Sequence, residues 1–162
     1  MKTVNELMEH MIQDLYSAET QALEAMPQLA SRVQNAELRQ AFDTHQRETE
    51  QQVKRLEQIA QKMGISTEGE TCMGMQGLIE EAQDLLDQLE DDQLADAAII
   101  GAAQKMEHYE IAGYGTARTM AQQAGQQEIA DLLEQTLQEE KSTDEKLTRI
   151  ATGKVNQQAT KA

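Results

Sequence analysis

Seven ionisable residues occupy positions where the helical periodicity of this chain places its apolar side chains. Four long segments repeat apolar residues at intervals of three and four, and the seven fall within these stripes rather than on the polar faces. A buried carboxylate must be neutralised by a proton, a basic partner or a metal ion. Converging carboxylates and histidine inside a helical bundle can hold two metal ions. The seven residues are Glu19, His45, Glu48, Glu107, Glu110, Glu140 and Asp144.

The composition restricts the fold to helices. The 162 residues include one Phe, no Trp, three Tyr and one Pro, whereas Ala, Gln, Glu and Leu are abundant. The abundant residues favour helices, and the aromatic and β-branched residues that favour strands are scarce. A chain of this length buries a substantial core as a single domain. We therefore expect one all-α domain over residues 1–150 and a polar tail over residues 151–162 that frays.

Apolar periodicity predicts the helices and their ends. Asn35 is placed to cap a helix, and Gly64 and Gly125 are placed to end helices. Pro27 is expected to kink the first helix or to end a first segment there. The predicted long helices cover residues 4–33, 36–63, 92–124 and 126–150, and a short helix covers residues 75–89.

The connections between these segments predict the topology. Short turns make the helices of each pair antiparallel, whereas residues 64–91 form a long connector that contains the short helix. A long middle connection lets a four-helix bundle return along its own length, and the ferritin-like topology has one such crossover. We therefore expect a ferritin-like four-helix bundle built from two antiparallel hairpins.

Hairpin geometry places the acids at one level of this bundle. Residues equidistant from a turn lie at the same height in an antiparallel pair. The midpoint of Glu19 and Glu48 falls at 33.5, and that of Glu110 and Glu140 falls at 125, so both lie within predicted turns. Each acid is then about 22 Å from its turn at 1.5 Å per residue. Both hairpins therefore predict a carboxylate layer near the middle of the bundle.

The types of ligand indicate the metal. Pairs separated by three or four residues share one helix face, as do His45 and Glu48. Carboxylate oxygens with one imidazole suit Mn²⁺ or Fe²⁺ better than Zn²⁺ or Cu²⁺. The sequence thus predicts two divalent ions, Fe or Mn, with Glu48 and Glu140 as the bridging ligands.

A metal-free alternative stays open, in which the acids are paired with bases or protonated. It requires basic side chains on the inward faces of the helices. The candidates are expected to point outward, and they are Arg47, Arg55, Lys105 and Lys141.

Charge and targeting signals limit the partners. The net charge of −15 argues against nucleic acid and against anionic membrane surfaces, because both require a basic face. No run approaches ~18 apolar residues, and the first residues lack the features of a secretory signal. The single cysteine, Cys72, cannot form an intramolecular disulfide, which favours a reducing compartment. We expect a cytoplasmic protein.

Other reactive side chains have simpler interpretations. Tyr16, Tyr109 and Tyr114 are expected to pack with satisfied hydroxyl groups, although a role in electron relay or in hydrogen bonding to a bound species stays open. Cys72 is expected to be a buried, inert thiol. His108 follows Glu107 but lies about 100° further round the helix, which favours an outer or surface role.

Several stretches resemble the YciF-type ferritin-like proteins, a bacterial stress-response family. They are DLYSAE (14–19), HQRET (45–49), GLIEEA (77–82), DAAIIGAAQKMEHYEIAGYGT (96–116) and EEKSTDEKLT (139–148). The resemblance covers nearly the whole chain. It implies a ferritin-like bundle, a homodimer and a di-metal centre formed by the seven residues named above. Better understood di-iron bundles use Glu-x-x-His pairs, whereas here the order His45-x-x-Glu48 is reversed.

Three functions follow as hypotheses. The first is a redox-active di-iron or di-manganese protein that acts on peroxide or oxygen during stress; whether it is an enzyme stays open. The second is metal sequestration without turnover, which requires a closed shell of many chains. The third is a structural or partner-binding bundle, whose stability would not change on chelation because no metal stabilises its native state.

Overall fold

The computed structural model describes residues 1–161, except for the side chains of residues 92 and 93. This part of the chain contains helices and no strands. The helices are α1 (Val4–Ser31), α2 (Ala36–Met63), α3 (Met73–Asp87), α4 (Asp92–Gln123), α5 (Gln127–Ile150), a π-helical turn η1 (Ala151–Val155) and α6 (Asn156–Ala159).

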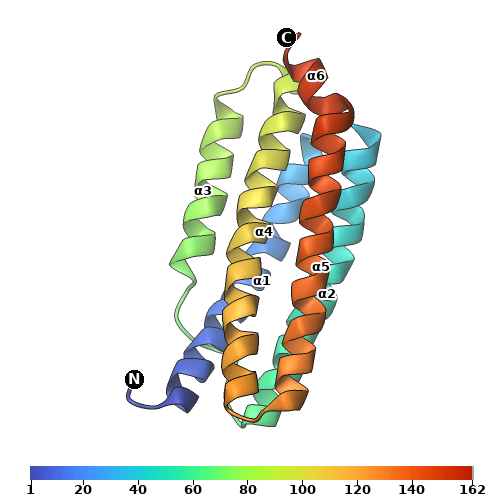
Figure 1. Ribbon diagram of the computed structural model, residues 1–162. Helices are drawn as coiled ribbons and strands as arrows, with labels where there is room; N and C mark the ends of the chain where they lie inside the picture. Colours follow the sequence, from blue (N-terminus) through green and yellow to red (C-terminus); the bar gives the residue numbers. More distant parts are fainter. Residues whose placement is uncertain (162) are drawn as a thin grey trace.

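The four long helices form a bundle of two antiparallel hairpins (Figure 1). Helices α1 and α2 form one hairpin and α4 and α5 the other; α1 packs against α4, and α2 packs against α5. The crossover between the hairpins carries α3, which lies along the outside of the bundle against α4 and α1. The expected all-α, ferritin-like four-helix bundle is confirmed.

The helix ends follow the predicted capping residues. The Asn35 side chain accepts hydrogen bonds from the backbone N–H groups of Glu37 and Leu38 at 2.9 and 3.0 Å, which satisfies two donors at the start of α2. Gly64 and Gly125 adopt φ angles of 69° and 74°, in the left-handed region that favours glycine. Gly64 ends α2 as predicted, and Gly125 lies in the turn that follows α4.

Helix α1 does not end at Pro27, contrary to one of the expected outcomes. Pro27 lies on the exposed face of the helix. A proline removes one backbone hydrogen bond, and a carbonyl that loses its partner on this face can be hydrated. A proline on the solvent side is therefore compatible with one continuous helix.

The C-terminal segment also differs from the prediction. Residues 151–155 form η1 and residues 156–159 form α6, so the segment does not fray. Ala151 and Val155 are buried against the bundle. Their spacing of four residues places both side chains on one face, and burial of this small apolar face holds the segment in place.

A polar layer divides the apolar core into two parts. One apolar cluster includes Met26, Phe42 and Ile99, and the other includes Ile12 and Leu133. Along each long helix the residues of one cluster give way to those of the other near the helix centre. The positions at that transition hold the ionisable residues singled out by the sequence.

The outer surface carries the excess of acids that gives the chain its net charge of −15. Acidic side chains on this surface form scattered ion pairs with Lys62 and Lys105. Within residues 1–161, none of the helices combines the length and apolar character needed to cross a membrane.

Candidate metal centre

The four long helices all contribute ionisable side chains to the central polar layer. Glu19 comes from α1, Glu107 and Glu110 come from α4, and Glu140 comes from α5. Between 0% and 2% of the surface of each of these four residues is exposed. His45 from α2 completes the set, and its side chain is 12% exposed.

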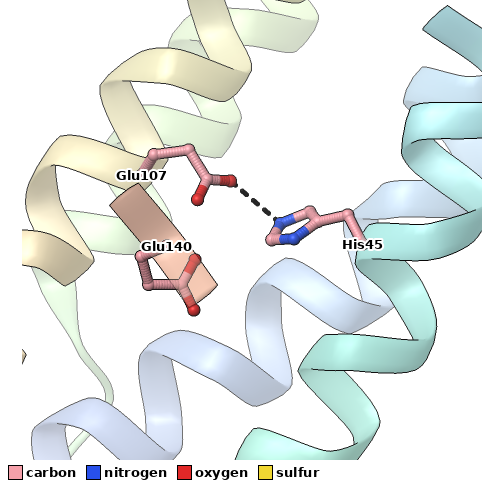
Figure 2. A group of neighbouring side chains, drawn as sticks. All are labelled: His45, Glu107 and Glu140. Atoms are coloured by element: carbon pink, nitrogen blue, oxygen red, sulfur yellow. Dashed lines mark ion pairs between the residues drawn. The ribbon is translucent and has the colours of Figure 1, made fainter. Parts of the chain in front are cut away.

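These five residues form two groups that share one carboxylate. His45 and Glu107 form the first group with Glu140, and Glu19 and Glu110 form the second with the same Glu140. Within each group, one ligand atom from every residue lies within 4.8 Å of the others. His45 Nε2 is 2.9 Å from Glu107 Oε1, as Figure 2 shows. Helices that are far apart in the sequence thus deliver their ligand atoms to one place.

Several polar atoms of this cluster have no hydrogen-bond partner although they are buried. Buried polar groups in folded proteins are almost always paired, so each exception requires an explanation. Divalent metal ions would pair with these atoms, because carboxylate oxygen and imidazole nitrogen are both metal ligands. The donor set therefore fits a metal centre. The unpartnered atoms are His45 Nδ1, Glu107 Oε2, Glu110 Oε1, and Oε1 and Oε2 of Glu140.

Glu19 has a partner for one of its oxygens. The hydroxyl of Tyr114 donates a hydrogen bond of 2.5 Å to Glu19 Oε1, and both residues are buried. Tyr114 follows Glu110 by four residues, so both side chains lie on the same face of α4. The Tyr114 hydroxyl was expected to have a hydrogen-bond partner, and that partner is Glu19, one of the candidate metal ligands.

Burial and mutual repulsion raise the pKa values of the clustered acids. Desolvation is the largest cause for Glu19, Glu107, Glu110 and Glu140. The pKa of Glu107 rises to about 8, and those of the other three acids rise well above the ordinary value of 4.5. Nearby carboxylates add to the shift; for example, Glu140 raises the pKa of Glu19. Without cations, Glu107 therefore holds a proton at neutral pH, and burial shifts the pKa values of the other three acids in the same direction.

Two of the seven predicted ligands, Glu48 and Asp144, belong to neither of the metal-compatible groups found among the described residues. Both carboxylates help to raise the pKa of Glu107, so they lie near it. Asp144 is occupied at the bundle surface: its Oδ1 accepts a hydrogen bond from Gln104 Nε2 at 3.0 Å and lies 3.3 Å from His108 Nε2. The ligand roles of all seven residues remain predictions.

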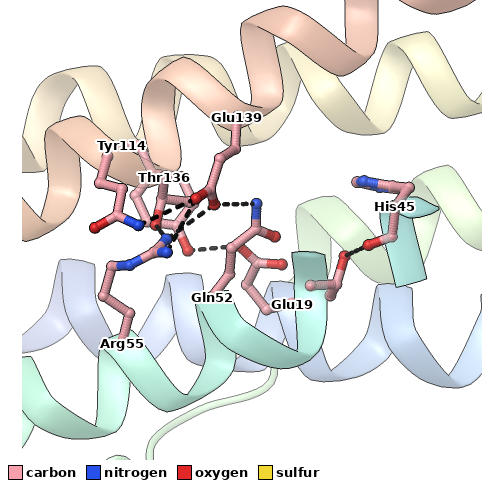
Figure 3. A network of polar contacts seen from close by, with 9 residues as sticks. Glu19, His45, Gln52, Arg55, Tyr114, Thr136 and Glu139 are labelled. Carbon is pink, nitrogen blue, oxygen red and sulfur yellow. Dashed lines mark hydrogen bonds and ion pairs between the residues drawn. The ribbon is translucent and has the colours of Figure 1, made fainter. Parts of the chain in front are cut away.

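Sequence reasoning missed a second buried polar cluster beside the carboxylates. Arg55 was expected to point outward, but its side chain is only 8% exposed, and Figure 3 shows it among buried polar side chains of the bundle. It donates two hydrogen bonds of 3.0 Å to the carboxylate of Glu139 and one of 2.5 Å to Thr136 Oγ1. Gln52 Nε2 also donates to Glu139, at 3.2 Å.

The sequence did contain a signal for this cluster. His45, Gln52 and Ile59 recur every seven residues, and Arg55 follows Glu48 by the same interval. Residues seven apart share a helix face, so Arg55 continues the inward stripe. Arg55 and Glu139 neutralise each other and require no added ion, although the buried Oε1 of Gln52 has no hydrogen-bond partner.

Cys72 and Tyr109 form a separate contact at the crossover. Cys72 is buried, and its sulfur lies 2.9 Å from the Tyr109 hydroxyl, which donates to Asp14 Oδ2 at 2.9 Å. Burial raises the pKa of the Cys72 thiol, which keeps it protonated. The expectation of a buried thiol is confirmed. His108 is 68% exposed and lies at the surface, as expected.

Comparison with known proteins gives consistent matches. Residues 3–160 match the family described as "Domain of unknown function (DUF892)". The chain is 44% identical to Protein YciF of Escherichia coli (strain K12) over 160 residues, covering 98% of this chain and 96% of that protein.

Two solved structures have the same fold. The crystal structure of the E. coli stress protein YciF matches with a TM-score of 0.91, covering 96% of this chain and 99% of that chain at 44% identity. YcfI from Rhodopseudomonas palustris, described as a proposed structural protein, matches with a TM-score of 0.89 at 37% identity, covering 91% of this chain and 94% of that chain.

The fold and the central layer define a class: ferritin-like four-helix bundles whose buried carboxylates and histidine could hold metal. Within that class, the chain belongs to the DUF892 family and is a homologue of the E. coli stress protein YciF. The resemblance noted in the sequence is confirmed.

Proposed function

We propose that this protein binds two divalent metal ions, Fe²⁺ or Mn²⁺, in the central layer of the bundle. His45 and Glu107 would hold one ion, and Glu19 and Glu110 would hold the other. Glu140 would bind both. The observation that carries this proposal is the position of Glu140: it belongs to both groups, is fully buried, and has no hydrogen-bond partner apart from the carboxyl group of Glu107.

Charge balance supports two ions rather than one. The two groups contain four carboxylates, Glu19, Glu107, Glu110 and Glu140, which carry four negative charges when ionised. Two divalent cations would neutralise all four, whereas with one cation two of the acids would have to stay protonated. An uncompensated buried charge is costly. Glu48 and Asp144 would then act from the edge of the centre.

The finer proposal is that the loaded centre acts on peroxide or oxygen during stress. A pair of redox-active metal ions supplies electrons to such a ligand and can hold both of its oxygens. The chain's own residues would support this: the apolar clusters above and below exclude water, and Tyr114 holds Glu19 by its hydrogen bond. The relative YciF is described as a stress protein.

The first test is the metal content of protein purified without chelators or an affinity metal, by element-resolved mass spectrometry. We expect about two Fe or Mn per chain. Glu140→Gln should lose both ions, and Glu145→Gln should lose neither because Glu145 is exposed. Absence of stoichiometric metal after anaerobic reconstitution with Fe²⁺ and Mn²⁺ would retire the proposal.

Peroxide consumption by the loaded protein tests the finer proposal. It should exceed that of the Glu140→Gln variant, and equal rates would contradict a redox role. We also expect a cytoplasmic location, because a lone buried thiol suits a reducing compartment, and a homodimer, as the family resemblance implies. Sedimentation would check the assembly: a shell of many chains would favour metal storage instead.

A structural bundle without metal is the second candidate. The raised pKa values of the four acids favour it, since protons can neutralise them in place of metal. The description of the relative YcfI as a proposed structural protein points the same way. This candidate predicts identical thermal stability before and after exhaustive chelation, whereas a metal bound only by the native state must stabilise it.

A further inference from the structure

We infer that the two ion positions of the proposed centre are unequal and fill in order. The outer group, His45, Glu107 and Glu140, first takes a transition ion that binds imidazole well, such as Fe²⁺ or Co²⁺. The inner group, Glu19, Glu110 and Glu140, takes a harder ion such as Mn²⁺ second. This inference rests on the proposed function, because it concerns the loading of the same centre.

The ligand atoms of the two groups differ in kind. The outer group contains an imidazole, and its Nδ1 is buried without a hydrogen-bond partner. The inner group contains only carboxylates. Imidazole suits Fe²⁺, Co²⁺ and Zn²⁺, whereas sites made only of oxygen suit Mn²⁺ and Mg²⁺. The two positions of one centre therefore prefer different metal ions.

The two groups also differ in their contact with solvent. In the outer group Glu107 and Glu140 are buried, but the His45 side chain is 12% exposed and connects the group with solvent. Only 1% of Glu19 and 2% of Glu110 are exposed, so the inner group is sealed. An ion arriving from solution must lose its hydration water, and the outer group can exchange water for ligands in steps. The outer group therefore fills first.

Hydrogen bonding and charge make the inner position weaker for a second ion. Tyr114 already donates to one oxygen of Glu19, so fewer lone pairs of this carboxylate are available there. Glu140 is shared, so an ion in the outer group has already taken part of its negative charge. The inner group still has a buried, unpartnered ligand atom, Glu110 Oε1. The inner position thus exists, with lower affinity once the outer one is filled.

Metal titration of the wild-type protein tests this order. Metal-free protein is titrated with Co²⁺ and followed by visible absorption and calorimetry; the first equivalent should bind at least about tenfold more tightly than the second. The protein is then given one equivalent of Co²⁺ and excess Mn²⁺, and native mass spectrometry should detect mainly the species with one of each. Two equal Co²⁺ affinities, or a statistical mixture of the three loaded species, would overturn the inference.

Two variants separate the positions. His45→Ala should lose the tight Co²⁺ equivalent, whereas Glu110→Gln should keep it and lose the second equivalent. His108→Ala is the matched control, because this exposed histidine lies outside both groups and should change neither equivalent. Similar losses of both equivalents in the two test variants would contradict unequal positions.

The outcomes distinguish the two proposals. Failure of the wild type to bind any metal would remove this inference together with the proposed function. If the wild type binds two ions with equal affinity, this inference is wrong but the proposed function stands. Circular dichroism establishes whether each variant is folded, and if one is not, the wild-type mass spectrum decides the question.

Discussion

Two buried polar clusters lie side by side in this bundle, and they satisfy their charges in opposite ways. Arg55 and Glu139 form one cluster, in which the cation belongs to the protein and every Arg55 contact lies within 3.0 Å. The other cluster contains Glu19, Glu107, Glu110 and Glu140 with His45, which pairs with Glu107, and five of its polar atoms lack partners.

This difference separates a structural ion pair from a site that is prepared for a ligand. A buried ion pair with its own hydrogen bonds is complete, and it requires only that both partners stay in place. A buried group with unpartnered atoms is incomplete, because some other species must supply the missing charge. The two clusters should therefore respond differently to mutation, metal and pH.

The largest effect is expected from breaking the complete cluster. Arg55→Met leaves Glu139 without its cation and should lower the free energy of unfolding by about 3 kcal/mol, the low end for buried pairs because Glu139 is 25% exposed. Added metal should not restore the loss. Urea denaturation measures it, with Arg118→Met as the control: Arg118 pairs with Glu134 near the surface, and its loss should cost at most about 1 kcal/mol. Equal losses in the two variants would contradict the structural role of Arg55.

The incomplete cluster should instead respond to metal. At 100 times its dissociation constant, each ion adds about 2.7 kcal/mol to the free energy of unfolding, and Glu140→Gln should abolish this gain. In chelator the same variant should be more stable than the wild type, because a buried carboxylate becomes permanently neutral. Urea denaturation of both proteins checks both expectations: with Mn²⁺ only the wild type should gain stability, and in chelator the variant should be the more stable protein. A variant that keeps the metal gain would show that Glu140 is no ligand.

The pH dependence of the metal-free protein sharpens the contrast. The folded pKa of Glu107 is about 8 against an ordinary value of 4.5, so the folded state holds this proton more tightly than the unfolded chain. The contribution of Glu107 to the free energy of unfolding is fully present below about pH 4.5 and is lost as the pH rises to about 8. Within this window, stability should fall by about 1.4 kcal/mol per pH unit for each such carboxyl.

Denaturation midpoints at pH 5, 6, 7 and 8 measure this slope. Saturating Mn²⁺ should reverse it, because the metal displaces protons from its ligands. A metal-free stability that rises with pH across this range would mean that the cluster is ionised and compensated in some other way.

The smallest effect is expected at the edge of the centre. Asp144→Asn should leave about two ions per chain and change the free energy of unfolding by no more than about 0.5 kcal/mol, as is usual for surface positions. Asp144 accepts a hydrogen bond from Gln104, lies beside the exposed His108 and belongs to neither group that contains the shared carboxylate. Metal analysis checks this, and loss of an ion would return Asp144 to the ligands that the sequence predicted.

Constant helix geometry explains why much of this could be predicted from sequence. A fixed rise per residue and two well-marked turns place Glu110 opposite Glu140 without any knowledge of packing. The same regularity, with Asn35 and the two turn glycines, predicts the helix boundaries to within a few residues. Burial of Glu19, Glu110 and Glu140 followed from their places in the apolar stripes.

The remaining details depend on how each helix is rotated in the bundle. A stripe about 100° wide contains both Glu48 and Arg55, and the sequence cannot say which of two neighbours on it points at the centre. A long side chain such as arginine can also reach inward from the edge of a stripe. The order of η1, which precedes α6, depends on burial of Ala151 and Val155 against the other helices, and local periodicity in a short polar segment does not reveal this burial.

The division of the apolar core by a central polar layer has a consequence for how the protein opens. Long helices usually fray from their ends, where fewer contacts protect the backbone. Here the apolar clusters hold both ends of the bundle, and in the absence of cations the middle contains buried acids with unpartnered polar atoms. Backbone amides near Glu110 should then exchange hydrogen with solvent faster than amides near Ile99 or Ala121. Ion binding would slow exchange at the centre of the molecule and leave its ends unchanged.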